Sequence, residues 1–298
     1  MIYDVVIIGL GAAGLSASIY AKRSGLNVAV INFSTPGGII NESSIVENYP
    51  GFKSISGPDL AFNFFEHFNS LDVPLFNEEV IDIIDGDIKK VITKNNEYNA
   101  KKVIICSGRK PRKLGLENED KYFGKGISYC TLCDGNLYKD KTVCVVGGGN
   151  SALESVHYLN DICKKVYLLV RSNRMIADES FVENAKTLEN VEILLETKIE
   201  KFLINDEKII GVKTNNSELE IDGIFVNIGY EPSIGILKSL DLEMDRNYIV
   251  VDKNMETSIK GIYACGDIIK KDLYQLVTAV SEGAIAATSI YNSLKYQK

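Results

Sequence analysis

The sequence predicts an α/β protein made of two nucleotide-binding domains, each a three-layer structure. Two glycine-rich turns, beginning at Gly9 and at Gly147, each follow a short apolar run and precede a stretch of small and apolar residues. The 298 residues suffice for two domains, at roughly 100–200 residues per domain. Hydrophobic residues make up 45% and charged residues 24%, which excludes disorder as the dominant state.

The first unit begins at the N-terminus. Tyr3–Ile8 is rich in Val and Ile, which predicts a buried strand, and it leads into the turn Gly9-Leu10-Gly11-Ala12-Ala13-Gly14. A helical stretch continues to about Ser24, and Gly25 is well placed to cap its end. Asn27–Asn32 predicts the next strand.

The same order recurs 138 positions later, which is the difference between Gly9 and Gly147. Lys141–Val146 predicts a strand, and the turn is Gly147-Gly148-Gly149-Asn150-Ser151-Ala152. A helix from Ala152 to about Ile162 and a strand over Lys165–Val170 follow. Each copy therefore has the Rossmann-like pattern of strand, G-x-G-x-x-G/A, helix and strand.

This spacing has a physical reason. The first glycine makes a tight turn, the second lets the backbone approach a pyrophosphate, and the third position must be small so that the helix packs on the strand. The pyrophosphate then meets the unpaired N–H groups at the start of the helix. Two such sites favour a flavin and a nicotinamide, which exchange a hydride in oxidoreductases. The alternative is that both glycine turns only shape the fold.

The remaining predicted elements complete this layout. Two apolar strands end in glycine-containing turns, which suits crossings between domains, and two short strands precede a C-terminal helix. In chain order they are Lys102–Ile105 before Cys106-Ser107-Gly108, Asp222–Ile228 before Gly229, Ile249–Asp252, Gly261–Ala264 before Cys265-Gly266-Asp267, and Leu276–Leu294.

Cys130 and Cys133 form a C-x-x-C pair, followed by Asp134, just before the second unit. In a reducing compartment such a pair is more often catalytic than structural. An adjacent carboxyl is suited to deliver or collect the proton of disulfide chemistry. The alternative is a pair of reduced, buried cysteines. The other cysteines are expected to be small apolar fillers, namely Cys106, Cys144, Cys163 and Cys265.

The composition argues against several classes of protein. With 33 basic and 40 acidic residues, the net charge of -7 disfavours sequence-independent binding of nucleic acid or of an anionic membrane. His67 and His157 lie far apart, so we expect no metal site. The uncharged stretch Val5–Ala21 is interrupted by glycines and lacks a basic segment before it. We therefore expect a cytoplasmic protein with neither a membrane span nor a targeting segment.

Five motifs in a fixed order match one family. They are the turn at Gly9, Glu47-Asn48-Tyr49-Pro50-Gly51, Cys130-Thr131-Leu132-Cys133-Asp134, the turn at Gly147, and Ala264-Cys265-Gly266-Asp267. Over nearly its whole length, the chain therefore resembles the low-molecular-weight thioredoxin reductases. The C-x-x-C-D motif within the nicotinamide domain is specific to that group and its close relatives.

The resemblance implies a homodimer of two-domain subunits. The FAD-binding domain would comprise residues 1–112 and 241–298, and the pyridine-nucleotide domain, residues 113–240, would be inserted in it. Asp267 would hold the ribityl chain of FAD. The implied FAD contacts are Gly9, Gly11, Ala12, Ala13, Gly14, Gly38, Ile39, Asn48, Val80, Ser107, Asp267, Gln275 and Leu276. The implied nicotinamide contacts are Gly147, Gly149, Ser151, Ala152 and Glu154.

The resemblance also implies a reaction. A donor reduces FAD, FAD reduces the Cys130–Cys133 disulfide, and the dithiol reduces thioredoxin through a mixed disulfide. In the family Cys133 is the sulfur next to the flavin, Cys130 attacks the partner disulfide, and Asp134 is the acid/base. Because one C-x-x-C cannot face both a buried flavin and an outside protein, the domains are expected to rotate between the two steps.

The segment that selects the nicotinamide departs from the family pattern. NADPH-dependent members have His-Arg-Arg-x-x-x-Arg, whereas this chain has Val170-Arg171-Ser172-Asn173-Arg174-Met175-Ile176. Only Arg171 is in register for a 2′-phosphate, and Val170 leaves no acid for the ribose of NADH. Either NADPH or NADH binds weakly, or another donor such as ferredoxin reduces the flavin. The FAD-binding domain also departs from the family pattern, at Asn32, Ile39 and Tyr274. We still expect FAD to bind there.

Other functions are compatible with parts of the same sequence. A flavin disulfide oxidoreductase acting on a small-molecule dithiol would have the same cysteine pair, and a non-enzymatic flavin redox sensor would have the same folds. Ferredoxin–NADP reductases of related fold lack the pair, which argues against that class. A hydroperoxide-reductase flavin subunit is disfavoured because no further domain precedes Tyr3.

Overall fold

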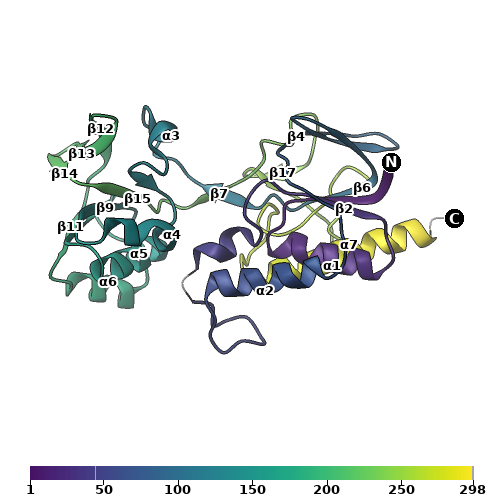
Figure 1. Cartoon of the computed structure of the whole chain (residues 1–298), viewed down its shortest axis with the longest axis horizontal. Helices are drawn as coiled ribbons and strands as arrows, with labels where there is room; N and C mark the ends of the chain where they lie inside the picture. Colours follow the sequence, from purple (N-terminus) through teal and green to yellow (C-terminus); the bar gives the residue numbers. More distant parts are fainter. Residues whose placement is uncertain (44, 297–298) are drawn as a thin grey trace. The chain divides into compact units, whose positions relative to one another are not determined.

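The computed structural model describes residues 1–43 and 45–296. The chain forms two compact units (Figure 1). Unit 1 comprises residues 1–110 and the chain from residue 232 onward, and unit 2 comprises residues 111–231. The resemblance places the second domain limit later, at 240/241. Residues 232–240 group with unit 1 here because Leu237 and Leu240 are buried in its core.

Unit 1 is built on a seven-stranded mixed sheet. Its strand β1 is buried on both faces: Val5 and Ile7 belong to one core, and Val6 and Ile8 to the other. This explains why the run is continuously apolar instead of alternating. In sheet order the strands are β3 (Leu75–Phe76), β2 (Val28–Ile31), β1 (Ile2–Ile8), β6 (Glu97–Ile105), β5 (Lys89–Thr93) and β4 (Val80–Ile84), and β19 (Ile262–Ala264) pairs with β6.

Helices pack together beside this sheet (Figure 1). α1 and α7 approach closely because small residues form their contact: a Cβ at Gly283 would lie 2.2 Å from the carbonyl oxygen of Ala13. Gly25, with φ of +79°, ends α1 as predicted. The helices of unit 1 are α1 (Ala12–Arg23), α2 (Gly57–Asn69), α7 (Leu276–Tyr296) and the 3-10 helix η1 (Gly38–Glu42).

The predicted strand over Ile249–Asp252 is wrong beyond its first residue. β18 spans Tyr248–Ile249 and pairs with β17 (Met244–Asp245). The Asp252 carboxylate accepts the backbone N–H of Asn254 at 2.8 Å and that of Glu256 at 2.9 Å. A side chain that satisfies its own backbone in this way favours a turn over a strand.

Unit 2 has a five-stranded parallel sheet and a separate three-stranded antiparallel sheet. In β9, Val143 and Val145 face one core, and Cys144 and Val146 face the other. The sheet orders are β11 (Val191–Leu194), β10 (Lys165–Leu169), β9 (Thr142–Val146), β15 (Gly223–Val226) and β8 (Ile127–Ser128), and then β12 (Ile199–Asn205), β13 (Lys208–Thr214) and β14 (Glu218–Glu220). The helices are α3 (Glu119–Tyr122), α4 (Thr131–Asp134), η2 (Gly135–Tyr138), α5 (Asn150–Asn160) and α6 (Glu179–Lys186).

Both copies of the predicted repeat are confirmed as strand, glycine turn, helix and strand. α5 begins two residues before the predicted start, because it follows directly from the N-cap Gly149. The chain passes between the units within β7 (Arg109–Pro111) and β16 (Tyr230–Pro232), directly after the two predicted strand–glycine steps.

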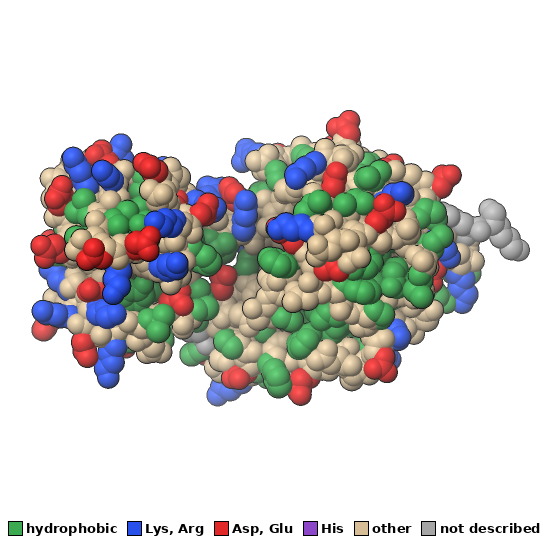
Figure 2. Space-filling view, turned by 45° about the horizontal axis from the view of Figure 1, so that its top comes forward, with side chains coloured by type: hydrophobic (Ala, Val, Ile, Leu, Met, Phe, Trp, Pro, Cys, Tyr) green, Lys and Arg blue, Asp and Glu red, His purple; other side chains and the backbone are tan. Residues whose placement is uncertain are grey.

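Charged side chains of both signs lie on the surface of the chain. On the face shown in Figure 2, acidic and basic side chains are interspersed over both units. Among the residues that the structure describes, no helix combines the length and the apolar character that crossing a bilayer requires.

Candidate active site

Unit 1 contains a cavity of about 420 Å³ where β1 and β2 end and α1 begins. Six stretches of the sequence line it: the glycine turn, the end of β2, the residues around η1, the segment Cys106–Arg109, Gly266–Asp267 and the start of α7. This is the edge of a parallel sheet at which dinucleotides bind, at the carboxyl ends of the strands.

Most residues implied for FAD line this cavity. Two do not. Gly14 lies behind the turn, where a Cβ would be 2.0 Å from the carbonyl oxygen of Gly9, so Gly14 permits helix–strand packing. Val80 is buried in β4, in the core that also holds Leu237 and Leu240. The implied residues that do line the cavity are Gly9, Gly11, Ala12, Ala13, Gly38, Ile39, Asn48, Ser107, Asp267, Gln275 and Leu276.

The turn suits a pyrophosphate. Gly9 has φ of +96°, and a Cβ there would lie 2.4 Å from the carbonyl oxygen of Cys106, so the position requires glycine. At Gly11 the nearest atom to a Cβ would be 3.9 Å away, so its backbone faces open space. Among the described residues, no side chain caps α1 at Gly11, and the first turn has no acid. The N–H groups and positive end of α1 are therefore available to the pyrophosphate of FAD.

Asp267 stands in the cavity wall within a network of charges. Its carboxylate accepts two hydrogen bonds from Arg109, at 2.7 and 3.1 Å, and Lys271 lies 3.5 Å away. Lys271 also pairs at 2.9 Å with Glu282, whose carboxylate accepts the N–H of Gly266 at 2.8 Å. Burial raises the pKa of Glu282, and Lys271 opposes that shift. Asp267 is thus fixed by two cations at a position suited to accept a hydroxyl hydrogen bond.

Two further contacts organise the cavity. Asn48 donates a hydrogen bond of 3.1 Å to the side chain of Gln275, which joins two implied FAD contacts from distant parts of the sequence. Asn32, at the end of β2, accepts the N–H of Leu10 at 3.0 Å, and its amide group donates to the carbonyl oxygen of Ser34. Asn32 therefore fixes the loop that follows β2 in the cavity wall.

Several residues of this cavity were not predicted from the sequence, and two of them shape it. Arg109 lines it, bonds Asp267, and lies 4.7 Å above the ring of Tyr274. No motif marks Arg109, because its partners come from the far end of the chain. Gly37, with φ of +97°, donates its N–H to the carbonyl oxygen of Leu10 at 2.8 Å. The turn signal Pro36-Gly37-Gly38 would have located this residue.

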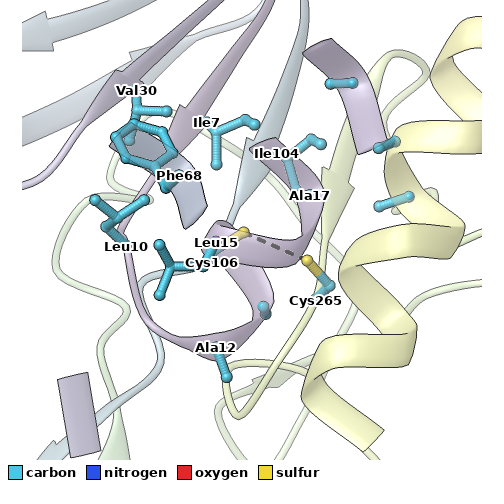
Figure 3. Close-up of a cluster of buried hydrophobic side chains, with 14 of the residues drawn as sticks. Ile7, Leu10, Ala12, Leu15, Ala17, Val30, Phe68, Ile104, Cys106 and Cys265 are labelled. Carbon is cyan, nitrogen blue, oxygen red and sulfur yellow. Dashed lines mark hydrogen bonds between the residues drawn. The ribbon is translucent and has the colours of Figure 1, made fainter. Parts of the chain in front are cut away.

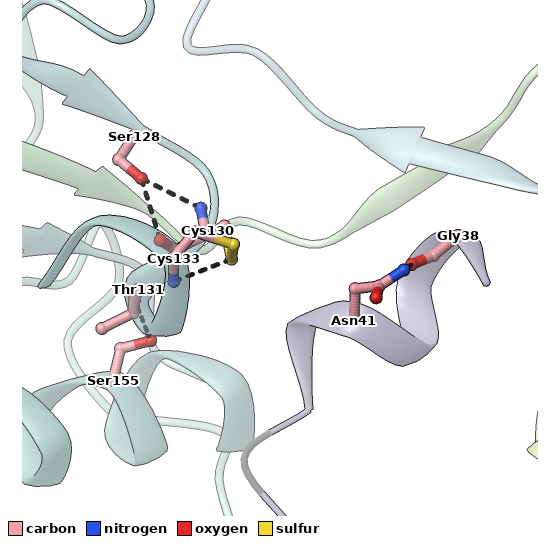
Figure 4. Close-up of a disulfide and its surroundings, with 7 residues drawn as sticks. All are labelled: Gly38, Asn41, Ser128, Cys130, Thr131, Cys133 and Ser155. Atoms are coloured by element: carbon pink, nitrogen blue, oxygen red, sulfur yellow. Dashed lines mark hydrogen bonds between the residues drawn. A yellow bond between two sulfur atoms is a disulfide. The ribbon is translucent and has the colours of Figure 1, made fainter. Parts of the chain in front are cut away.

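Unit 2 contains the predicted cysteine pair, joined as a disulfide (Figure 4). Cys130 is the N-cap of α4, and its sulfur accepts the N–H of Cys133 at 3.2 Å. The buried Ser128 hydroxyl bonds both the N–H and the carbonyl oxygen of Cys130, each at 3.1 Å. Thr131 donates a hydrogen bond of 2.8 Å to Ser155 of α5. This bond holds α4, and with it the cysteine pair, against α5, the helix that starts at the second glycine turn.

Carboxylates lie on both sides of the pair in sequence. Asp134 ends α4 and is half-buried. Burial of Tyr138 raises the pKa of its phenol, and the charge of Asp134 raises it further. Glu119 is 4% exposed and accepts the backbone N–H groups of residues 114, 115 and 116. It also accepts the Tyr129 hydroxyl at 2.5 Å, which together with burial raises the pKa of that phenol. Glu119 thus anchors the strand that leads into Cys130.

The second glycine turn connects β9 to α5. At Gly147, which has φ of +148°, a Cβ would lie 2.2 Å from the carbonyl oxygen of Asn227. At Gly149 no atom lies within 4 Å of such a Cβ, and no side chain of the described residues caps the helix there. The turn therefore offers open backbone and unpaired N–H groups to a second pyrophosphate.

The other implied nicotinamide residues fall into two groups. Ala152 is fully buried beneath the turn and packs there, whereas Ser151 and Glu154 are exposed on α5. Arg171 follows β10 and is exposed, as is Arg174. The segment that carries these arginines is held beside the turn, because the N–H of residue 176 bonds the carbonyl oxygen of residue 148 at 2.7 Å.

Comparisons with known proteins agree with this arrangement. A thioredoxin reductase of Mycoplasma genitalium is 41% identical over 99% of this chain and 96% of its own length. The crystal structure of Lactococcus lactis thioredoxin reductase has a TM-score of 0.88 at 35% identity and covers 97% of this chain and 98% of that one. A ferredoxin-flavin thioredoxin reductase from Clostridium acetobutylicum, at 33% identity, has a TM-score of 0.56 and covers 100% of this chain and 99% of that one.

The family match spans both units. Residues 3–283 match the family described as pyridine nucleotide-disulphide oxidoreductase, which includes both glycine turns, the cysteine pair and Asp267. The chain therefore belongs to the pyridine nucleotide-disulphide oxidoreductase family.

Proposed function

We propose that this protein is a flavin-dependent thioredoxin reductase, in which electrons pass from FAD through Cys130 and Cys133 to the disulfide of thioredoxin. The Cys130–Cys133 disulfide carries the proposal, because it is a reducible bond on one nucleotide-binding unit of a chain whose other unit has a dinucleotide cavity. Relatives named thioredoxin reductase match the chain over nearly its full length, which supports this substrate.

Unit 1 would hold FAD through its own backbone and a few side chains. The N–H groups at the start of α1 would bind the pyrophosphate, and the Asp267 carboxylate would accept a ribityl hydroxyl. Asn48 and Gln275 would close the same cavity. When bound, FAD supplies two-electron transfer between a hydride donor and a disulfide.

The cysteine pair would act as a two-electron relay. Its reduction breaks the S–S bond and takes up two electrons and two protons. We assign the attack on thioredoxin to Cys130, because the N–H of Cys133 donates to its sulfur and would stabilise the thiolate. Asp134 would move the proton. The Cys130 thiolate would form a mixed disulfide with thioredoxin, and Cys133 would resolve it.

We further propose that NADPH or NADH is the donor. The open backbone at Gly149 and the uncapped start of α5 support a second dinucleotide, and the exposed Arg171 and Arg174 supply cations for a 2′-phosphate. A ferredoxin is the competing donor. It is favoured by the serine and isoleucine that replace family arginines at 172 and 176, and by the likeness to the Clostridium enzyme.

Anaerobic reduction with NADPH, NADH and reduced ferredoxin in parallel tests the donor. Bleaching of the flavin absorbance by either nicotinamide at micromolar concentration supports the second turn as its site. If only ferredoxin bleaches the flavin, the nicotinamide proposal is wrong and the rest of the electron path is unaffected.

Insulin reduction with and without added thioredoxin tests the substrate. Turnover that requires thioredoxin is expected. Direct oxidation of small dithiols at a comparable rate would favour the small-molecule oxidoreductase instead. A flavin that is reduced but is never reoxidised by either substrate would favour a redox sensor.

We also propose that the protein acts in the cytoplasm as a homodimer. The four cysteines outside the pair are free thiols, which suits a reducing compartment, and the dimer is what the family resemblance implies. Sedimentation equilibrium of the FAD-loaded protein tests the second point: a mass of twice 32.9 kDa is expected, and a monomer would contradict it.

A further inference from the structure

A second pair of cysteines, Cys106 and Cys265, lies in a buried cluster of unit 1 (Figure 3). Cys106 directly follows β6, and Cys265 directly follows the neighbouring strand β19. Their sulfur atoms are 3.3 Å apart, and the two side chains are 6% and 0% exposed. Both are buried, as the apolar fillers predicted from the sequence would be. Their contact is not visible in the sequence, because 159 positions separate them.

The geometry of this pair allows a bond. The strands pair in parallel and their ladder ends with Ala264 opposite Ile105, so Cys265 and Cys106 are each the next residue after that last pair. Neighbouring strands lie about 4.8 Å apart, which falls within the range of Cα separations found in disulfides. The sulfurs would need to move together by only about 1.2 Å to reach a bonding distance of about 2.05 Å. We propose that Cys106 and Cys265 form a second thiol/disulfide couple, which a small peroxide closes when the FAD cavity is open.

Access explains the dependence on the cavity. Cys106 lines the cavity, whereas Cys265 is fully buried behind it. The hydrogen bond with Cys106, with burial, raises the pKa of the Cys265 thiol, so little of Cys265 is present as the reactive thiolate. The Cys106 sulfur therefore meets an oxidant that enters the cavity, and bound FAD would cover it.

The chemistry balances with hydrogen peroxide as the oxidant. The Cys106 sulfur attacks one peroxide oxygen, the O–O bond breaks, and a sulfenic acid and one water form. The Cys265 sulfur then displaces the sulfenic hydroxyl as a second water, and the S–S bond forms. In sum, two thiols and one peroxide give one disulfide and two waters.

A disulfide between Cys106 and Cys265 would alter the glycine turn at Gly9, where FAD is proposed to bind. The carbonyl oxygen of Cys106 lies 2.4 Å from where a Cβ of Gly9 would be, and a Cβ of Gly266 would lie 2.9 Å from that of Ala13. Cys106 thus lies directly against the glycine turn, and the residue after Cys265 lies directly against the start of α1, in a part of the core without spare room. Movement of the sulfurs would shift the backbone that binds the pyrophosphate, so the oxidised apoprotein is expected to bind FAD at least tenfold more weakly.

The test uses the full-length Cys130→Ser/Cys133→Ser variant, which retains four thiols, at Cys106, Cys144, Cys163 and Cys265. Its apoprotein and its FAD-loaded form are each treated with hydrogen peroxide, quenched, denatured, alkylated and mapped by mass spectrometry. The apoprotein is expected to lose two thiols and to yield a peptide cross-linked through Cys106 and Cys265. The FAD-loaded form is expected to keep all four. FAD titration of both apoprotein forms then measures the expected loss of affinity.

Internal and external controls make the result decisive. Cys144 and Cys163 are also buried, but each lacks a thiol neighbour among the described residues, so both should be alkylated in full. With Cys106→Ser added, Cys265 should remain a free thiol. Four intact thiols in the apoprotein, sulfinic acids without a cross-link, or equal cross-linking with FAD bound would each overturn the proposal.

Discussion

The carboxylate of Asp267 lies in the wall of the FAD cavity, where we propose that it accepts a ribityl hydroxyl. Arg109 and Lys271 hold it from two sides, and Glu282 balances the second cation. A hydrogen bond to a charged acceptor contributes about 1.5–3 kcal/mol, more than one to a neutral group. The cations therefore fix the carboxylate in place and keep it available for a flavin hydroxyl.

Asp267→Asn is expected to raise the Kd of FAD at least tenfold, which corresponds to about 1.4 kcal/mol. The neutral amide would lose both the charge-assisted bond and the pairing with Arg109. Fluorescence titration of the apoprotein with FAD measures the change. Asp272→Asn is the matched control, because Asp272 is exposed and is not among the residues that line the cavity. Equal affinity of the two variants would contradict the role of Asp267.

Some site residues were predictable from the sequence, and others were not, for a physical reason. Cys130 and Cys133 are marked by spacing alone, since three positions suffice to place two sulfurs in reach. Arg109 pairs with a residue 158 positions away, and Cys106 meets one 159 positions away. Contacts of that kind depend on the sheet topology, which no local pattern encodes.

The two glycine turns use their glycines for different purposes. In each turn the first glycine of the G-x-G pattern, Gly9 or Gly147, has a positive φ and no room for a side chain. The second glycine of the pattern, Gly11 or Gly149, faces open space. The first glycine thus serves the fold and the second serves the ligand, and substitution should separate the two effects.

Gly147→Ala is expected to destabilise unit 2 by about 1–3 kcal/mol or more, because alanine is strained at φ of +148° and its Cβ would meet Asn227 at 2.2 Å. Gly149→Ala should leave the urea midpoint unchanged, since its φ is −100° and nothing lies within 4 Å. It should instead raise the Kd of the nicotinamide at least tenfold, because the methyl group stands where the pyrophosphate approaches.

Urea unfolding and nicotinamide titration of both variants check this division. Equal unfolding midpoints for Gly147→Ala and the unmodified chain would contradict the assignment of Gly147. Unchanged nicotinamide affinity in Gly149→Ala would show that the second turn does not bind a pyrophosphate.

Where burial decides the limits of a strand or helix, the predicted and observed limits agree to within a few residues. β1 and β9 are buried on both faces, so their apolar runs identify them well. The strand expected over Ile249–Asp252 ended early because the Asp252 side chain forms a turn with its own backbone. The pattern of apolar residues does not show where one polar side chain will bond the backbone and form a turn in place of a strand.

The division into two units predicts how ligands stabilise the chain. A ligand that binds only the folded state of one unit stabilises that unit according to its concentration relative to its Kd. FAD is therefore expected to slow hydrogen exchange of amides around its cavity, in the Gly9 turn, near Cys106 and at the start of α7. Amides of the core strands β9 and β15 should change little. Exchange mass spectrometry of apoprotein and FAD-loaded protein checks this, and equal protection of both units would contradict it.

The electron path through the cysteine pair is tested by thioredoxin-dependent insulin reduction, measured alongside flavin bleaching in the same samples. We expect the unmodified protein and Cys163→Ser to reduce insulin. Cys130→Ser/Cys133→Ser should lose this turnover by at least a thousandfold while its flavin is still bleached by the donor. Retained turnover in that double variant, or a purified protein without flavin, would contradict the path proposed here.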